Sequence, residues 1–221
     1  MGAVYYKSRA EAGQKAATAL LAKNGNPASV VSLSTDAVVT AAQIAVMLKC
    51  PLHLFMSTEI SVPGGIGVGS VDLYGDFRYN SEGGASFGEY YYQEFRSYID
   101  QGKRQAFSDL NRELGAHEVL RKDLLNKRNV FLVVDCLESM ALVQSFMESV
   151  KSISINKLIV CAPIALSEVL TPMQQQADDY FVEGVVEFFY GADHYFEDNT
   201  VISREESIQK ISEALAAWPR Q

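Results

Sequence analysis

Metal-ligand and disulfide patterns are missing from this sequence. Its three cysteines, Cys50, Cys136 and Cys161, form no CxxC pair, and its three histidines stand far apart. Structural zinc sites need such ligands at short, regular spacings, so we predict no metal site. An odd number of cysteines within or beside apolar runs indicates reduced, buried thiols and a cytoplasmic location.

Positive charge and long apolar runs are scarce as well. The 221 residues include 19 Lys and Arg against 27 Asp and Glu, a formal net charge of −8. Surfaces that bind nucleic acids need clustered basic side chains, so we expect no nucleic-acid partner. No apolar run reaches the roughly 20 residues that span a bilayer, so we expect no membrane partner. The N-terminus has no apolar signal segment, and secretion is not indicated.

What the chain does contain is an alternation of apolar strands and helical patterns. Such alternation predicts an α/β fold, doubly wound around a mostly parallel sheet, in a single domain over residues 1–221. Val130 to Asp135 is the expected central strand, because its unbroken apolar run implies burial on both faces. The other expected strands are Ser29–Leu33, Leu52–Met56, Lys157–Ala162 and Tyr180–Glu187. The expected helices begin at Ser8 and at Ala37, Glu89, Met140, Leu166 and Ser203.

Capping patterns support two of these helices. Ser8 with Glu11 and Ser203 with Glu206 have the spacing of capping boxes. Thr35 or Asp36 is expected to cap the helix that begins at Ala37.

A glycine-rich segment, Ser61 to Gly69, is expected to be a loop that feeds a β-hairpin with its turn near Tyr74 to Asp76. The segment contains G-x-G-x-G, which is part of some nucleotide-binding fingerprints. Those fingerprints open a helix, whereas this segment leads into the strand-like VGSVDLYGDF. The hairpin interpretation is therefore preferred.

The segment from Val130 to Val143 reads VFLVVDCLESMALV. An apolar strand ends at Asp135, a turn over Cys136 to Ser139 is expected to follow, and a helix begins near Met140. Open α/β sheets bind ligands at such carboxyl ends of strands. The segment resembles the signature of type I phosphoribosyltransferases, in which an apolar strand leads into two acids and a turn rich in glycine and threonine.

Four further segments resemble a bacterial group of stand-alone phosphoribosyltransferase-like proteins, in the same order along the chain. They are Ser8–Gln14 (SRAEAGQ), Ser34–Ala45, Pro51–Val71 and Phe189–Asp198. The resemblance implies the type I phosphoribosyltransferase fold with a β-hairpin insertion. It also implies that the chain pairs into a homodimer.

The resemblance also implies where phosphoribosyl pyrophosphate would bind. The 5′-phosphate and ribose would lie at Asp135, Cys136, Leu137, Glu138 and Ser139. The diphosphate would lie at a second loop, Thr35 and Asp36, and at a third loop, Thr58 and Glu59. Magnesium would be a cofactor only of an active enzyme, and otherwise no cofactor is expected.

The departures from the family pattern fall on these positions. Val134 replaces the first acid, and Glu138 puts negative charge where the phosphate would lie. Asp36 and Glu59 stand where a polyphosphate needs positive charge or bare N–H donors. The catalytic residues are therefore unknown.

Several residues have alternative interpretations. Asp135 is either a ribose acceptor or a structural relic, and Glu138 is either a general base or a partner of the helix dipole. Cys136 is either a nucleophile or an inert thiol. His194 either lines the cleft or is a solvated loop residue.

Three functions remain open at this point. The first is a phosphoribosyltransferase-fold protein that has lost phosphoribosyl transfer and acts by binding or assembly. The second is an active phosphoribosyltransferase, or related nucleotide enzyme, with a rebuilt site. The third is a structural subunit of a larger complex, with a protein partner. The first is preferred, because the departures fall on the chemistry. The surplus of aromatic residues near Tyr90 to Tyr92 adds to the expectation of a homodimer.

Overall fold

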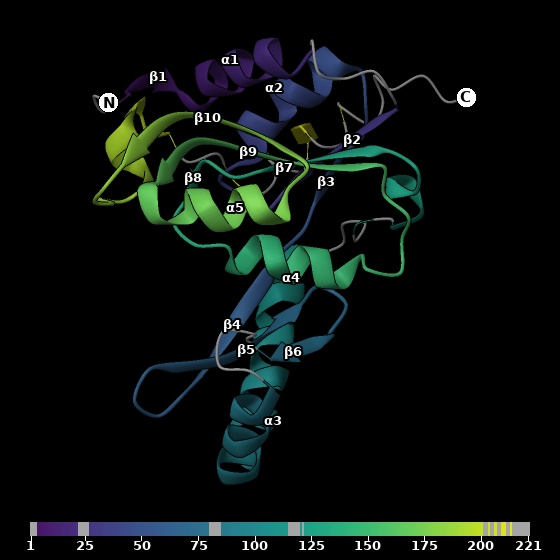
Figure 1. The fold of residues 1–221 in the computed structure, drawn as a ribbon, viewed down its shortest axis with the longest axis vertical. Coiled ribbons are helices and arrows are strands. Elements are labelled where there is room, and N and C mark those ends of the chain that lie inside the picture. The colour runs from purple at the N-terminus through teal and green to yellow at the C-terminus, as the bar shows by residue number, and fades with distance from the viewer. Residues whose placement is uncertain are drawn as a thin grey trace. The chain divides into compact units, whose positions relative to one another are not determined.

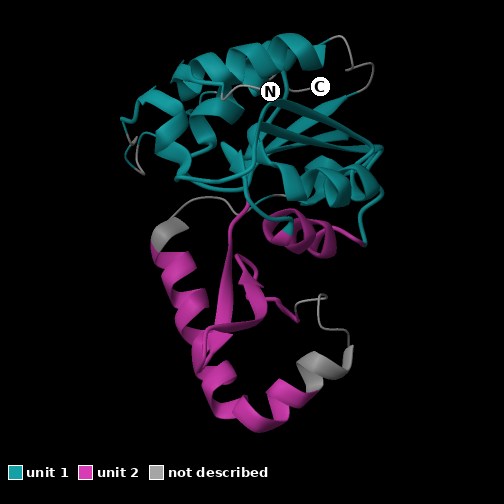
Figure 2. Cartoon of the chain, turned by 60° about the vertical axis from the view of Figure 1, so that its left-hand side comes forward, with its two compact units in different colours: residues 1–54, 120–140, 152–221 teal, residues 55–119, 141–151 magenta. Residues whose placement is uncertain are grey.

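The computed structural model describes most of the chain, in two compact units (Figure 2). The described residues are 4–21, 27–79, 85–114, 120, 122–200, 203, 206, 209, 210 and 213. The first unit contains residues 1–54, 120–140 and 152–221, and the second contains residues 55–119 and 141–151. Both units are built from segments that are separated in the sequence. The single domain expected over residues 1–221 stays a prediction.

The first unit is built around a parallel sheet. Its strands follow the order β10-β9-β7-β2-β3, and each neighbouring pair is parallel. A short strand, β8, also pairs with β9. The bounds are β2 Ala28–Ser32, β3 Leu52–Leu54, β7 Asn129–Val133, β8 Cys136–Leu137, β9 Lys157–Leu166 and β10 Asp179–Val186. This sheet confirms the predicted fold class, and β7 is central as expected.

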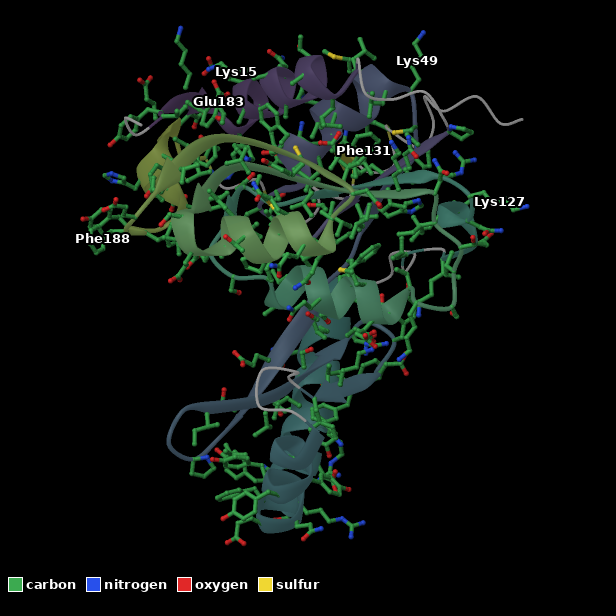
Figure 3. The ribbon with its side chains drawn as sticks, viewed as in Figure 1. Lys15, Lys49, Lys127, Phe131, Glu183 and Phe188 are labelled. Atoms are coloured by element: carbon green, nitrogen blue, oxygen red, sulfur yellow. The ribbon has the colours of Figure 1, made fainter. Side chains whose placement is uncertain are left out.

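Burial explains the central position of β7. All five of its residues are buried, which requires cover on both faces of the sheet. Helices α1 (Arg9–Leu21) and α2 (Val38–Leu48) lie on one face, and α5 (Leu170–Gln176) lies on the other (Figure 1). Phe131, in the middle of β7, is completely buried between them (Figure 3).

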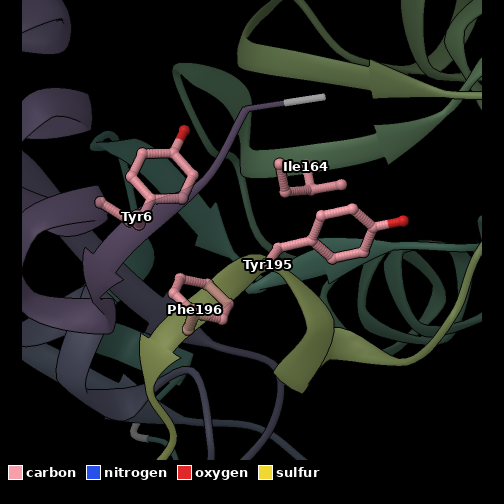
Figure 4. Packing of buried hydrophobic residues seen from close by; sticks show 5 residues of the cluster. Tyr6, Ile164, Tyr195 and Phe196 are labelled. Atoms are coloured by element: carbon pink, nitrogen blue, oxygen red, sulfur yellow. The ribbon is translucent and has the colours of Figure 1, made fainter. Parts of the chain in front are cut away.

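A two-stranded parallel sheet closes one end of the first unit. It pairs β1 (Tyr6–Ser8) with β11 (Phe196–Asp198). The rings of Tyr6 and Phe196 stack with centroids 5.7 Å apart, in a buried cluster that includes Ile164 and Tyr195 (Figure 4). No sequence pattern predicted this pairing, because its strands are short and nearly the whole chain separates them.

The second unit contains a three-stranded antiparallel sheet and two helices. The strands are β4 (Ser57–Val62), β5 (Ile66–Asp72) and β6 (Phe77–Tyr79), and the helices are α3 (Ala85–Leu114) and α4 (Ala141–Ser149). The β5–β6 hairpin confirms the turn expected near Tyr74 to Asp76. Helix α3 is kinked at Phe95, where the backbone is not helical.

The expected glycine-rich loop over Ser61 to Gly69 is wrong in most of its length. Residues 66 to 69 belong to β5, and a tight turn remains at Gly64 and Gly65, which have φ angles of 97° and 76°. A Cβ at Gly69 would lie 2.2 Å from the carbonyl oxygen of Arg78 on the neighbouring strand. Gly64 and Gly65 therefore permit the turn, and Gly69 permits the close approach of β5 and β6.

Other differences concern the ends of elements. Strand β9 continues to Leu166, four residues beyond the expected Ala162, so α5 begins later than expected, after a 3-10 turn, η3 (Ser167–Val169). Helix α3 begins at Ala85, before the expected Glu89. Both serines cap as expected, since the Ser8 and Ser203 hydroxyls accept the N–H groups of Glu11 and Glu206 at 3.2 Å. The reciprocal bond of a capping box forms at Ser203, whose N–H donates to Glu206 at 2.8 Å, whereas Glu11 accepts the N–H of Lys7. Most of the helix expected from Ser203 to Trp218 lies outside the described residues. Among the described helices, none combines the length and the apolar character that crossing a membrane requires.

Candidate functional site

The sheet order locates the first candidate site. The chain runs outward from β2 to β3 on one side and from β7 to β9 and β10 on the other, so the order reverses between β2 and β7. Ligands of open α/β sheets bind at such a switch point, beyond the carboxyl ends of the strands. The two strand ends meet there, where the N–H of Leu33 donates to the carbonyl of Val133 at 3.0 Å. The two segments that follow the strands carry the first and second predicted loops.

Asp135 lies at this point, but both of its carboxylate oxygens are occupied by other side chains. Arg9 Nε donates to Oδ2 at 2.6 Å, and the Thr40 hydroxyl donates to Oδ1 at 2.6 Å. Asp135 is only 5% exposed. Burial raises the pKa of Asp135, and the Thr40 hydrogen bond and the Arg9 charge offset only part of that increase. The structure thus places this acid in a closed internal contact.

Arg9 also contacts two residues of the C-terminal segment, Asp193 and Phe196. Its Nη2 donates to Oδ1 of Asp193 at 3.0 Å, and its guanidinium lies 4.8 Å from the centroid of the Phe196 ring. Burial lowers the pKa of Arg9, but Asp193 and Asp135 outweigh burial and raise it overall. Arg9, Thr40, Asp135 and Asp193 form what we call the switch-point network. It connects α1, α2, the end of β7 and a 3-10 turn, η4 (Ala192–Tyr195).

Sequence reasoning identified one member of this network, Asp135, and missed the other three. A signal for them existed, because each stands in a segment that carried the family resemblance. Arg9 belongs to SRAEAGQ, Thr40 to the helix of the second segment, and Asp193 to the C-terminal segment. The structure brings these segments together around one buried ion pair.

The turn expected over Cys136 to Ser139 is wrong for its first two residues. Cys136 and Leu137 form β8, which pairs with β9 at Ile164 and Ala165. Their main chain therefore takes part in a strand ladder rather than in a phosphate-binding turn. Glu138 and Ser139 are exposed beyond it, and desolvation raises the pKa of Glu138.

The Cys136 thiol lies beside two acids. Burial raises its pKa to about 12, and the charges of Asp135 and Glu138 add to the increase. The thiolate is the nucleophilic form of cysteine, so a thiol with this pKa is protonated at neutral pH. The geometry supports an inert thiol.

The second predicted loop, Thr35 and Asp36, is closed by its own hydrogen bonds. The Ser34 hydroxyl accepts the N–H of Ala37 at 3.2 Å, and the Thr35 carbonyl accepts the N–H of Val38 at 3.2 Å. The N-cap of α2 is Ala37, which makes no side-chain cap hydrogen bond, so the cap expected from Thr35 or Asp36 is wrong, and the Ser34 hydroxyl holds the turn before the helix. Asp36 lies close enough to Asp135 for its negative charge to raise the pKa of Asp135 further.

The third predicted loop is not a loop. Thr58 and Glu59 lie within β4 of the second unit, paired with Val71 and Ser70 of β5. The segment was assigned as a loop from the family resemblance, and its strand pairing corrects that assignment.

No family model and no curated protein sequence matches this chain. Among solved structures, it is similar to the protein TT1426 from Thermus thermophilus, with 19% identity and a TM-score of 0.73. That match covers 98% of this chain and 100% of TT1426. It shows a shared fold over the whole chain. The match and the parallel sheet confirm the predicted α/β fold class, and the phosphoribosyltransferase kind of that fold is what the sequence resemblance implied.

Two other solved structures are more distant from this chain. A purine phosphoribosyltransferase from Pyrococcus horikoshii Ot3 has 11% identity and a TM-score of 0.48, over 83% of this chain and 88% of its own. A hypothetical protein from Neisseria gonorrhoeae with bound ppGpp has 10% identity and a TM-score of 0.48, over 95% of this chain and 96% of its own. At these scores, nothing about the ligands of this chain follows from them.

Proposed function

We propose that this chain is a phosphoribosyltransferase-fold protein that has lost phosphoribosyl transfer and acts by binding or assembly, as a homodimer. One observation carries the proposal. Of the two acids that end the signature strand in the family, only Asp135 remains here. It is buried, and its two carboxylate oxygens accept hydrogen bonds from Arg9 and Thr40. To accept the hydroxyls of a ribose it would have to leave a buried ion pair, and Arg9 would then keep only Asp193 as an acidic partner, which is costly.

The surrounding residues do not fit a magnesium-bound diphosphate. The N–H groups of Ala37 and Val38 are used within the second loop, and Asp36 adds negative charge beside them. Glu138 stands exposed at the end of β8, again with negative charge. Polyphosphate binding depends on cations and on free N–H donors. The side chains at positions 35, 36 and 138 are Thr, Asp and Glu, and none of them is a cation.

A calorimetric titration with phosphoribosyl pyrophosphate and magnesium tests the proposal. We expect no saturable binding below about 100 μM, which corresponds to a binding free energy near −5.5 kcal/mol. We also expect no rise in melting temperature, because any ligand that binds the native state must stabilise it. An active phosphoribosyltransferase titrated under the same conditions is the positive control.

A variant without the two negative charges at the loop positions makes the test sharper. Asp36→Asn combined with Glu138→Gln removes the repulsion at the two loop positions and leaves the switch-point network unchanged. We expect this variant to remain without affinity, because Asp135 is still held by Arg9 and Thr40. Tight binding by the unmodified chain would reverse the proposal in favour of an active enzyme with a rebuilt site. Tight binding by the variant alone would show that repulsion, rather than the ion pair, blocks the ligand.

A further inference from the structure

A second part of the first unit has the form of a binding site. An open hollow of about 620 Å³ lies at the carboxyl end of β10, between the start of α5 and the η4 turn. Small-molecule sites commonly have volumes of about 300–1,000 Å³. None of the residues that line the hollow belongs to residues 34–36 or 135–139, so it is separate from the predicted ribose and phosphate positions.

Large aromatic side chains surround this hollow and remain exposed. Tyr190 is 71% exposed, Phe188 is 69% exposed and Tyr5 is 54% exposed. Figure 3 shows Phe188 at the outer edge of the first unit. Single exposed aromatics are ordinary, but several around one concave surface indicate a ligand or a partner.

The wall of the hollow is held in place by the core beneath it. Tyr195 lies in the buried cluster of Figure 4, and its hydroxyl donates to the carbonyl of Phe188 at 3.2 Å. Its ring stacks with Phe189 at 6.0 Å between centroids. Gly191 has a φ of 95°, and its carbonyl accepts the N–H of His194, which fixes the turn that carries His194. The exposed rings therefore stand on an ordered frame, which reduces the entropy lost on binding.

Contacts among the rings add to this order. The Tyr5 hydroxyl lies 3.3 Å from Nε2 of His194, and these two rings meet edge to face with centroids 5.7 Å apart. Tyr190 contacts His194 from another direction, with centroids 5.4 Å apart. The hollow thus presents several ring faces at fixed angles, rather than one flat patch.

The charge of the lining favours one class of ligand. Glu187 is the one carboxylate among the lining residues, and no Lys or Arg is among them. Aromatic faces attract cations, and the net charge of −8 also favours a positive ligand. We propose that this hollow binds a small organic cation that carries an aromatic ring, with the ring against Tyr5, Phe188 and Tyr190 and the positive group toward Glu187. The proposal does not depend on whether the switch point binds phosphoribosyl pyrophosphate.

Three probes test the roles of charge and of the aromatic ring on the full chain. Tryptamine has an aromatic ring and a positive charge, indole-3-acetate has the same ring system with a negative charge, and 2-cyclohexylethylamine has the charge without the aromatic ring. We expect saturable binding of tryptamine below about 1 mM in an NMR titration, and binding of the other two at least about tenfold weaker.

Variants assign the binding to the hollow. Tyr190→Ala and Glu187→Gln change exposed side chains, so both variants are expected to fold, and each should weaken tryptamine binding about tenfold. Tyr98→Ala is the matched control, because Tyr98 is a 52% exposed tyrosine in α3, outside the hollow. It should leave binding unchanged.

Three results would overturn the inference. The first is the absence of saturable tryptamine binding. The second is equal binding of indole-3-acetate, which would remove the role of charge. The third is binding that survives Tyr190→Ala and Glu187→Gln unchanged, which would place it elsewhere. Titration with phosphoribosyl pyrophosphate reports separately on the switch point, so each proposal fails by its own measurement.

Discussion

At the scale of single residues, the Arg9–Asp135 ion pair is a buried charged contact that joins α1 to the end of β7. Both side chains are almost completely buried, and Arg9 Nε lies 2.6 Å from Asp135 Oδ2. Removing one partner of a buried pair leaves an uncompensated charge, at a cost of about 3–5 kcal/mol. We expect Arg9→Ala to lower the free energy of unfolding by about that amount, measured by urea denaturation followed by circular dichroism.

A double variant separates the charge effect from the lost packing. Arg9→Met combined with Asp135→Leu removes both charges and keeps apolar volume, and replacing both members of a buried pair is often neutral. We expect it to recover most of the lost stability. Equal losses in the single and double variants would show that the network stabilises through shape rather than charge.

The Cys136 thiol gives a prediction that depends on pH. A free cysteine has a pKa of about 8.5, so about a quarter of it is thiolate at pH 8. With its pKa raised to about 12, Cys136 has only about one thiolate in 10⁴ molecules at that pH. Alkylation by iodoacetamide should therefore be about 10³-fold slower in the native protein than in urea, measured by mass spectrometry. Cys50 and Cys161 are buried, and a Cys136→Ser variant shows how much they contribute. Rapid native alkylation at Cys136 would contradict the inert assignment.

At the scale of elements, the contact between α1 and α2 explains why residue 13 is a glycine, which the sequence alone did not explain. Gly13 belongs to the family-like segment EAGQ, and a Cβ at this position would lie 2.5 Å from the carbonyl oxygen of Thr40. Alanine favours helices over glycine by about 1 kcal/mol, but overpacking against a backbone atom costs about 1–3 kcal/mol or more. We expect Gly13→Ala to lower the free energy of unfolding, because the backbone of α2 must shift.

The neighbouring residue provides the control for this prediction. Gln14→Ala changes an exposed position in the same turn of α1 and should alter stability by less than about 0.5 kcal/mol. Because Thr40 also holds Asp135, Gly13→Ala is expected to disturb the switch-point network as well. A more stable Gly13→Ala variant would mean that helix propensity outweighs the close contact.

The elements that the sequence predicted well are those with local signals. The apolar run at Val130 fixed β7, and the Ser8–Glu11 pair fixed the start of α1, because burial and capping act within a few residues. The β1–β11 pairing joins Tyr6 to Phe196, and no local pattern carries that information. Strand β4 was missed because the family resemblance assigned Thr58 and Glu59 to a loop. The start of β5 was missed because its glycines suggested a loop, whereas Gly69 serves a close strand contact.

The sequence indicated where a candidate site would lie, but not which side chains contact Asp135. The strand that ends before Asp135 lies at the centre of the sheet as expected, and whether a ligand binds there stays a prediction. The partners of Asp135 come from helix positions that are remote in sequence, and an arginine at the start of a predicted helix has no periodic signature. Whether the acid is open to a ligand or closed by Arg9 is therefore a property of tertiary packing.

At the scale of the whole molecule, the exposed aromatic residues of the second unit argue for self-association. Tyr90 is 64% exposed and Tyr98 is 52% exposed on α3, and Tyr79 and Phe107 are also exposed. Apolar surface of this kind usually marks an interface, and closed symmetric dimers are the most common oligomers. We predict a homodimer with twice the chain mass of 24.4 kDa, measured by light scattering at micromolar concentration.

Two pairs of substitutions decide where the dimer forms. Tyr90→Ser with Tyr98→Ser removes aromatic area from α3 and should shift the mass toward the monomer. Phe188→Ser with Tyr190→Ser removes equally exposed rings from the hollow of the first unit, and should leave the dimer intact while weakening tryptamine binding. A monomeric mass for the unmodified chain would refute the dimer. Dissociation by the second pair alone would assign the interface to the hollow, and its aromatic residues would then contact a second copy of the chain instead of a small cation.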